Sequence, residues 1–477
     1  MMAEPGHSTT QDSSSRIAGE IPKNRRGVVV VLSSITIGLV LARFMMISTL
    51  TAIIALLCGA VLAVTILLRK VDYLILVWIV LTSLIFFIMG RLFPPNYYEF
   101  VGRGIFWGLL VCIIAARAMD NVLRGRQFVR FDCTALKVII LFFLLWCVAT
   151  LFTSLNFYNS VKKVVQFVIA LGVSYTFYDF FSEDENNIKR VLMMLLVVAS
   201  SISVITVLVA VHSIVLGEPI YKKISLWFIN PNVLGYLLFP CIPVLISAGF
   251  YFIRSRFLKR VLVFTMLLAL FFSFHRTSWL ATLVAIGFLL WKGRMRVPIW
   301  TTVVIALFIA GLLFPAIGGD AFDYLTEYRY TGRDETWKAA WITAWDYPLL
   351  GTGPGNVRMV MPQYIVTPWL KAADTHSVYL TNAAEMGFPS VFILLAVYIA
   401  FLVSSLRIER ELKSDYLRSV TMGVTATFLG LLVHGIFENG SFLSPFVGAE
   451  FFVMLPYIFL GLPFACKKLD ERTSRPT

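Results

Sequence analysis

The sequence predicts an all-α fold, a polytopic membrane helix bundle of about 14 transmembrane helices, with 12 or 13 as alternatives. Of its 477 residues, 58% are hydrophobic and only 14% are charged, whereas soluble proteins carry about a quarter charged residues. Apolar runs long enough to cross about 30 Å of hydrocarbon recur from Val28 to Cys466. One long hydrophilic loop interrupts them, at roughly residues 316–376.

The first 27 residues are polar and rich in serine, and they end in a basic cluster. This composition is typical of a disordered tail. The first apolar run starts only at Val28, and no small-residue cleavage site followed by a soluble chain is present. We therefore interpret that run as a membrane anchor and not as a cleavable signal peptide.

The apolar runs define the predicted organisation of the chain. We expect a cytoplasmic tail over 1–27, a transmembrane bundle over 28–315, the large loop over 316–376, C-terminal transmembrane helices over 377–466 and a cytoplasmic tail over 467–477. The individual segments are 28–42, 48–68, 71–89, 104–119, 136–155, 161–181, 191–216, 227–252, 261–275, 278–292, 297–315, 378–405, 419–437 and 448–466. The first two are the least secure, because only a short turn at Arg43 separates them.

The basic residues indicate how the chain is oriented. With the N-terminus in the cytoplasm, most of the 41 lysines and arginines fall in cytoplasmic loops and tails, as the positive-inside rule requires. Both termini are then cytoplasmic and the large loop lies on the opposite side. The net charge of +14 therefore reflects topology and does not indicate nucleic-acid binding. None of the six cysteines lies in the loop, so no disulfide is expected there.

A helix is predicted within the loop. Thr331 is a candidate N-cap, and Asp334 and Glu335 follow in the first turn, where the helix dipole favours acidic residues. The helix should end before Pro348, and the GTGPG run that follows should turn the chain. This run resembles a phosphate-binding cradle only superficially, because no strand precedes it.

Trp337, Trp341 and Trp345 recur at every fourth residue and form one aromatic stripe on that helix. One interpretation is an amphipathic helix that lies on the membrane surface or on the bundle. Another is a platform for sugar rings. The two are compatible.

Two arginines are candidate anion-binding residues. Arg333 lies at the predicted helix start, where backbone amides also favour an anion and a guanidinium can bind phosphate through two hydrogen bonds. Arg276 follows a strongly apolar run, where an ionisable side chain is costly unless it has a partner or a task. A structural ion pair or snorkelling to the interface remains the alternative for Arg276.

His376 lies where the loop returns to the membrane, and Tyr379 and Glu385 follow on the next helix. A neutral imidazole there could accept a hydroxyl proton near neutral pH, although a purely structural histidine is the alternative. The weaker candidates are His275 and His434, with His212 weaker still.

Metal binding has little support in the sequence. The outer loops contain no Asp-x-Asp pair, and Asp320, Asp323 and Glu327 fit one solvated helical face. No histidine or cysteine pair has zinc spacing. We therefore expect no metal and no other cofactor.

Four stretches together carry a resemblance to a known family. They are FINPNVLGY at 228–236, HRTSWLA at 275–281, TGRDETWKAAWITAWDYPLLGTGPGN at 331–356 and THSVYLTNAAEMG at 375–387. In this order they resemble the bacterial O-antigen ligase and O-antigen polymerase superfamily, whose members have many spans and one large periplasmic loop. The resemblance covers about 225–390 well, and the first 200 residues only through their hydrophobic rhythm.

The resemblance implies an inverting, metal-independent glycosyltransferase at the periplasmic face of the bacterial inner membrane. It would move a glycan from undecaprenyl pyrophosphate to an acceptor hydroxyl. By position in the motifs, pyrophosphate binding falls to Arg276 and Arg333, catalysis to His376, and a supporting, structural role to Asn230 and Asn232. Tyr379 and Glu385, which follow His376 on the next helix, are further supporting candidates. Ser377 departs from the family pattern, in which an asparagine often follows the histidine.

Three functions stay open. A polymerase of O-antigen, surface polysaccharide or exopolysaccharide is slightly preferred, and a ligase of lipopolysaccharide biosynthesis, which transfers glycan to lipid A core, is the alternative. A polyprenyl-glycan flippase or transporter is the alternative of another class, although the paired Gly/Pro-broken helices of many transporters are not visible. The expected partners are the carrier-linked donor, a glycan or lipid A core acceptor, and membrane lipid, with no nucleic acid.

Overall fold

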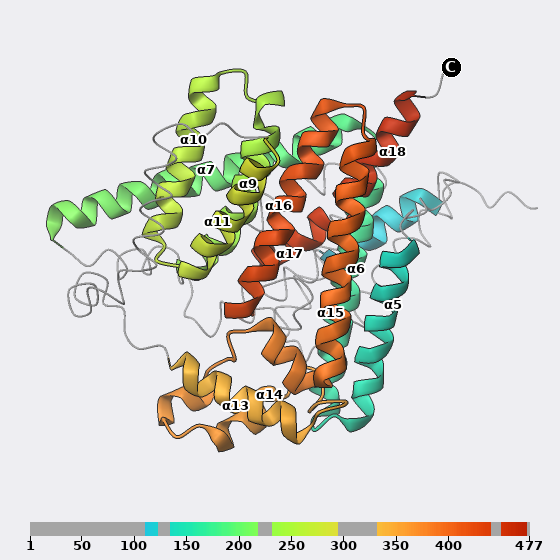
Figure 1. The fold of residues 1–477 in the computed structure, drawn as a ribbon, viewed down its shortest axis with the longest axis vertical. Helices are drawn as coiled ribbons and strands as arrows, with labels where there is room; N and C mark the ends of the chain where they lie inside the picture. Colours follow the sequence, from blue (N-terminus) through green and yellow to red (C-terminus); the bar gives the residue numbers. More distant parts are fainter. Residues whose placement is uncertain (1–109, 123–133, 218–230, 294–331, 440–449, 475–477) are drawn as a thin grey trace, which may run out of the picture.

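The computed structural model describes residues 110–122, 134–217, 231–293, 332–439 and 450–474, and these residues form helices and connecting turns without a strand (Figure 1). The segments predicted at 28–42, 48–68, 71–89 and 297–315 lie outside the described residues. Within the described part the chain is therefore all-α, as predicted. The total number of spans stays a prediction.

Residues 110–122 are helical, and the helices that follow have these bounds: α5 Thr134–Ala149, η2 Thr150–Thr153, α6 Phe157–Phe181, α7 Glu185–Leu216, α9 Pro231–Ala248, η3 Gly249–Tyr251, α10 Arg256–Phe272, α11 Arg276–Trp291, α13 Arg333–Asp346, α14 Val357–Val360, η4 Met361–Tyr364, η5 Pro368–Ala372, α15 Val378–Glu411, α16 Asp415–Phe437, α17 Glu450–Leu460 and α18 Leu462–Ser474. The segment predicted as one span at 448–466 is thus divided between α17 and α18. Gly461 and Pro463 stand at that division, and both residue types interrupt helices.

Six stretches of the described chain are long and apolar enough to cross a membrane: Ala135–Thr153, Phe157–Phe181, Glu185–Leu216, Asn232–Tyr251, Val378–Glu411 and Asp415–Phe437. α11 is apolar but shorter. Because a bilayer core needs about 20 apolar helical residues to be crossed, these helices define a membrane protein.

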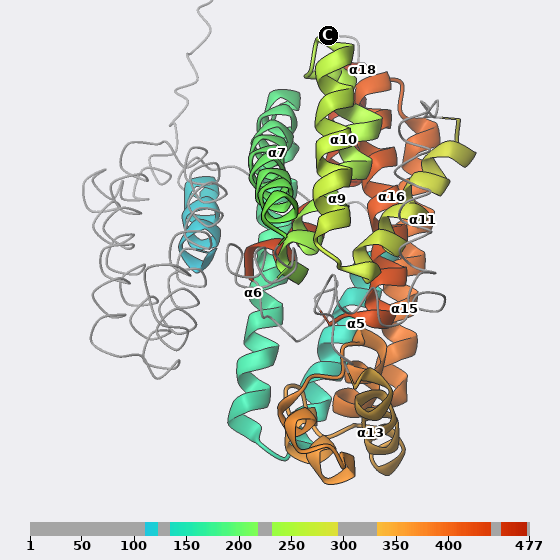
Figure 2. The same ribbon diagram turned by 90° about the vertical axis from the view of Figure 1, so that its left-hand side faces the viewer.

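α16 lies at the centre of the described bundle and packs against α9, α11 and α15 (Figures 1 and 2). Close approach depends on small residues, since a Cβ at Gly430 would come within 2.8 Å of the Ala281 carbonyl oxygen on α11. On the side of α9, the Thr427 hydroxyl donates a hydrogen bond of 3.1 Å to the Pro240 carbonyl. These contacts fix the helix whose C-terminal end reaches the site described below.

The described loop, residues 332–377, lies across one end of the bundle, where α13 runs crosswise to α15 (Figures 1 and 2). Its small apolar core packs directly on α15, and consists of Ala339, Ala340, Ala344, Val357, Met361, Ile365 and Leu370 against Ala383 and Ala384. The loop is therefore a folded layer on the bundle.

The loop is attached to a kink in α15. Gly387 has φ 77° and ψ 167° inside this helix, a conformation that only glycine adopts readily. Pro389 has no N–H to give to the carbonyl of Glu385, and that carbonyl instead accepts the Gly353 N–H at 2.8 Å. Next to it, the Thr352 N–H donates to the Ala384 carbonyl at 3.0 Å. The GTGPG turn thus satisfies the backbone groups that the kink sets free.

A second attachment joins the same turn to the connection between α5 and α6. The Asn356 side chain donates hydrogen bonds to Ser154 Oγ at 2.9 Å and to Ser160 Oγ at 3.1 Å. Asn159 Nδ2 donates to the Gly355 carbonyl at 2.6 Å. Together the two attachments hold the loop in one position over the bundle end.

Candidate functional site

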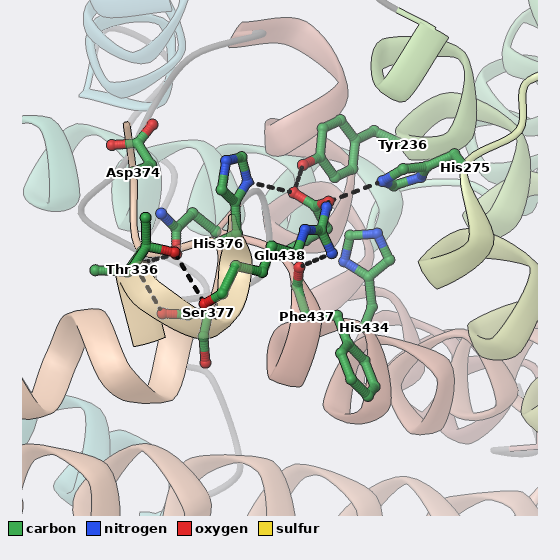
Figure 3. Close-up of polar contacts among 12 residues, drawn as sticks. Tyr236, His275, Thr336, Asp374, His376, Ser377, His434, Phe437 and Glu438 are labelled. Atoms are coloured by element: carbon green, nitrogen blue, oxygen red, sulfur yellow. Dashed lines mark hydrogen bonds and ion pairs between the residues drawn. The ribbon is translucent and has the colours of Figure 1, made fainter. Parts of the chain in front are cut away.

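Glu438 is the centre of a polar cluster at the loop end of the bundle (Figure 3). It follows the last residue of α16, and its side chain is only 3% exposed. One carboxylate oxygen, Oε1, accepts from Arg333 Nη2 at 2.6 Å and lies 3.2 Å from His275 Nε2. The other, Oε2, accepts from the Tyr236 hydroxyl at 2.9 Å and lies 3.5 Å from His376 Nδ1. Four segments far apart in the sequence therefore meet on one carboxylate.

Two residues at this cluster, Phe274 and His376, have an unusual backbone conformation. Among the described residues, Phe274 with φ 53° and His376 with φ 49° are the non-glycine residues in the left-handed region. Such a conformation costs about 1 to 3 kcal/mol and persists where the surroundings fix it, often at functional sites. Phe274 lies in the turn just before His275, the N-cap of α11. His376 lies where the loop ends, just before Ser377, the N-cap of α15.

The residues beside His376 and Glu438 fix the loop end further. The Thr375 hydroxyl donates to Asn439 Oδ1 at 3.1 Å, and Thr381 Oγ1 donates to the same oxygen at 2.9 Å. Ser377 is the N-cap of α15 and accepts from the Leu380 N–H. Asparagine is an equally good N-cap, so the serine that departs from the family pattern keeps a capping role.

Arg333 is the first residue of α13, and it makes two hydrogen bonds to the end of α16. Nη1 donates to the Phe437 carbonyl at 3.0 Å and Nη2 to Glu438. Its Nε is buried without a hydrogen-bond partner. The two hydrogen bonds fix the plane of the guanidinium, and the side chain as a whole is 25% exposed. The N-cap position before Arg333 is occupied by Gly332, with φ 62°, so the expected capping role of Thr331 was wrong; Thr331 itself lies outside the described residues.

A shell of aromatic and imidazole rings closes the other side of the cluster. His275 Nδ1 lies 2.6 Å from Ser278 Oγ, and the rings of Tyr236 and His275 are 5.3 Å apart in an edge-to-face arrangement. His434, one helical turn before Glu438, stacks on Phe239 with ring centroids 4.8 Å apart. These contacts orient the groups that hold Oε1 and Oε2.

The charge state of Glu438 follows from its partners. Burial alone would raise the pKa of this carboxyl, but the hydrogen bonds from His275 and His376 and the positive charges around it, including Arg333, hold the pKa well below its usual range. Glu438 is therefore ionised at neutral pH, and the guanidinium of Arg333 balances its charge.

The structure brings some of the sequence candidates together and separates others. Arg333 and His376 both contact Glu438. Arg276 is half-buried and follows His275 directly at the start of α11. Asn232 lies in the first turn of α9, the helix that carries Tyr236, and Asn230 is outside the described residues.

Tyr379 and Glu385 have contacts of a structural kind. The Tyr379 hydroxyl donates to the Leu432 carbonyl of α16 at 2.7 Å. Glu385 is buried beside the kink of α15, where Oε1 lies 3.4 Å from the Val357 N–H of the loop. Glu385 thus belongs to the attachment of the loop and is separate from the four groups around Glu438.

The aromatic stripe packs on the bundle along one side. Trp337 contacts Phe437 at the end of α16, and Trp341 and Trp345 contact Phe388 at the kink of α15. Trp341 nevertheless remains 48% exposed and Trp345 60% exposed. The stripe therefore packs on the bundle, and Trp341 and Trp345 also keep an exposed side.

The sequence analysis did not single out Glu438 or Tyr236. The signal for Glu438 was an acidic residue at the end of an apolar run, four residues after His434 in HGIFEN. Its partners cannot be read from the local sequence, because Arg333 is 105 residues away and Tyr236 is 202 residues away.

The described chain is thus an all-helical membrane protein with a buried, charged cluster where its folded loop meets the bundle. Residues 261–395 match the family model of the O-antigen ligases, and this range contains His275, Arg276, Arg333 and His376. The match supports the resemblance to the O-antigen ligase and polymerase superfamily and a membrane glycan transferase of that type. No curated protein is significantly similar to the chain. Tyr236 and Glu438 lie outside the matched residues.

Proposed function

We propose that this protein transfers a glycan from a polyprenyl pyrophosphate carrier, undecaprenyl pyrophosphate in bacteria, to an acceptor hydroxyl at the periplasmic face of the inner membrane. Both termini are cytoplasmic in this proposal. The observation that carries it is that Arg333, which can bind an anion, and His376, which can accept a proton, both lie in the family-matched region and contact the same carboxylate, that of Glu438.

In the proposed reaction, Arg333 and Arg276 bind the pyrophosphate. A guanidinium can donate two parallel hydrogen bonds to phosphate oxygens. The Arg333 side chain is 25% exposed, so part of it is open to a substrate, and Arg276 stands next to His275 at the N-terminus of α11, where backbone amides also favour an anion. Fixed positive groups in a site of low dielectric stabilise the charge that grows on the leaving group. The reaction therefore needs no metal ion.

His376 is the proposed general base. Its imidazole takes the proton of the acceptor hydroxyl as the hydroxyl oxygen forms a bond to the anomeric carbon. The bond from that carbon to the pyrophosphate oxygen breaks on the opposite face, and the electron pair leaves with polyprenyl pyrophosphate. The configuration at the anomeric carbon is inverted.

The preferred acceptor is another carrier-linked repeat, which makes the protein a polymerase of O-antigen, surface polysaccharide or exopolysaccharide. Transfer to lipid A core by a ligase uses the same chemistry. The glycans of a deletion strain separate the two, because loss of a polymerase leaves single repeats on the acceptor. Loss of a ligase leaves long chains on the carrier, and that outcome would reject the polymerase.

The central experiment uses the full chain purified in detergent, with a carrier-linked oligosaccharide, each acceptor in turn, and excess EDTA. We expect a new glycosidic bond and release of polyprenyl pyrophosphate. A requirement for magnesium or manganese would contradict the metal-independent mechanism. Unchanged substrate with every acceptor, together with movement of that substrate across reconstituted vesicles, would identify a transporter.

A further inference from the structure

Glu438 contacts Arg333 and His376, two of the three residues to which the proposed reaction assigns chemistry, although it lies outside the family-matched residues. We propose that Glu438 is a positioning residue, which holds the His376 imidazole with Nε2 toward the acceptor and holds the Arg333 guanidinium toward the pyrophosphate. This inference rests on the proposed function.

The contact with His376 determines which ring nitrogen acts. Nδ1 lies 3.5 Å from the Oε2 atom of Glu438, and a neutral imidazole beside a carboxylate carries its proton on the nitrogen that faces the carboxylate. Nε2 is then the proton acceptor. The His376 side chain is 34% exposed, so it is open to a substrate on its other side. A contact of this length can tighten when substrate binds.

The same carboxylate stabilises the product of proton transfer. When His376 accepts a proton, its imidazolium stands next to the negative charge of Glu438, as in the carboxylate and histidine pairs of hydrolases. This stabilisation exists only as charge develops, so it acts on turnover more than on substrate affinity.

Arg333 is oriented by Oε1, the other carboxylate oxygen of Glu438. Two of its nitrogens donate to fixed acceptors at the end of α16, the Phe437 carbonyl and Glu438. Because the guanidinium is planar, these bonds also determine the direction of its Nε. The carboxylate is in turn fixed by the Tyr236 hydroxyl and His275, so it cannot rotate without losing partners.

Both carboxylate oxygens of Glu438 accept hydrogen bonds, and this suggests the substitution to test. Glutamine has one oxygen and one NH₂ group. In Glu438→Gln the NH₂ group therefore replaces one of the two accepting oxygens and faces hydrogen-bond donors that it cannot accept from. The side chain keeps its volume but loses its charge and one acceptor. A matched control is Glu409→Gln, since Glu409 is also buried but lies near the other end of α15, 4.0 Å from Lys292.

The experiment is a double-mutant cycle in the transfer assay. We expect Glu438→Gln to lower kcat by about 10²-fold, within the range of general-base catalysis, and to raise KM for the donor only severalfold. In a His376→Ala background the same substitution should lower kcat less than about threefold, because its partner in proton transfer is already gone, while the severalfold rise in donor KM that comes from Arg333 should persist. Glu409→Gln should leave kcat nearly unchanged in both backgrounds.

A carboxylate that only secures the fold would give another result. The losses from Glu438→Gln and His376→Ala would then multiply, and that outcome would overturn the proposal. Turnover of folded Glu438→Gln within about threefold of the unchanged protein would do the same. Inactivity of the unchanged protein with every donor and acceptor would instead contradict the proposed function.

If Glu438→Gln does not fold, Tyr236→Phe takes its place in the double-mutant cycle with His376→Ala. It removes one hydrogen bond to Oε2 and leaves the charge of Glu438 in place. A reduction of kcat by about three- to tenfold, absent in the His376→Ala background, supports the proposal. An equal reduction in both backgrounds overturns it.

Discussion

Arg333 Nη2 lies 2.6 Å from Oε1 of Glu438, although the two residues are 105 positions apart in the sequence. The bond joins the first residue of the loop helix α13 to the end of the central helix α16. It places a guanidinium at the boundary between loop and bundle and fixes its plane.

Arg333→Lys should therefore not be a conservative change. A lysine keeps the positive charge but lacks the planar set of donors that reaches the Phe437 carbonyl, Glu438 and a phosphate together. We expect transfer to fall by about 10- to 100-fold, with weaker donor binding, because in the proposed reaction this group holds the pyrophosphate before and during departure. Donor affinity and single-turnover rate measured separately test this. Normal values for both in Arg333→Lys would contradict the assignment.

His376→Ala should separate turnover from binding. Loss of a general base costs about 10² to 10⁴ in rate, while the arginines that hold the carrier remain. We expect near-normal donor affinity with kcat reduced by that factor, measured on variant protein whose folding has been checked. If turnover persists, His275, which also contacts Glu438, becomes the next candidate for the base.

The stability of the protein should depend on Glu438 in acid. Its folded-state pKa is depressed, so its charged partners stabilise the fold above the unfolded value of about 4.3. This contribution is lost as the pH falls from that value through the lower folded pKa. The difference in melting temperature between the unchanged protein and Glu438→Gln should shrink as the pH falls from about 5 toward 3. A constant difference across the whole range would show that Glu438 is not ionised in the folded state.

Gly387→Ala should loosen the loop from the bundle. Gly387 has φ 77°, and an added Cβ would collide with the Leu349 carbonyl. We expect a loss of stability by about 2 kcal/mol or more together with loss of transfer. Gly287→Ala is the matched control, since Gly287 lies in α11 with open space around it, and there alanine should be neutral or stabilising. Equal melting temperatures for the two variants would argue against the close contact.

The orientation of the chain can be tested with reporter fusions. We expect a reporter that is active only in the periplasm to function after Asp334 and not after Arg472, because the positive-inside rule puts the basic C-terminal end in the cytoplasm. The reverse pattern would invert the topology and move the Glu438 cluster to the cytoplasmic side.

The helices were easier to predict than the site for physical reasons. Apolar runs determine membrane helices locally, so α6, α7 and α16 lie within a few residues of their predicted positions. The kink at Gly387 was not predicted, since glycine and proline also occur in continuous membrane helices. Glu438 was missed because its place in the cluster depends on contacts with Arg333, Tyr236 and His376. These residues are far from it in the sequence, so no local pattern contains them. His376 and Arg333, which contact Glu438, could be named as candidates from the sequence because each stands at a recognisable junction of loop and helix.

The two hydrogen bonds that attach the GTGPG turn to α15 join main-chain atoms on both sides. They depend on the backbone conformations of Gly387, Pro389 and the glycines of the turn, and not on the exposed side chains of α13. Substitutions on the outer surface of α13 can therefore change what the loop touches while the distance between Arg333 and His376 stays the same. In the proposed transferase, a loop fastened in this way can acquire new acceptor preferences while Arg333 and His376 keep their places on Glu438.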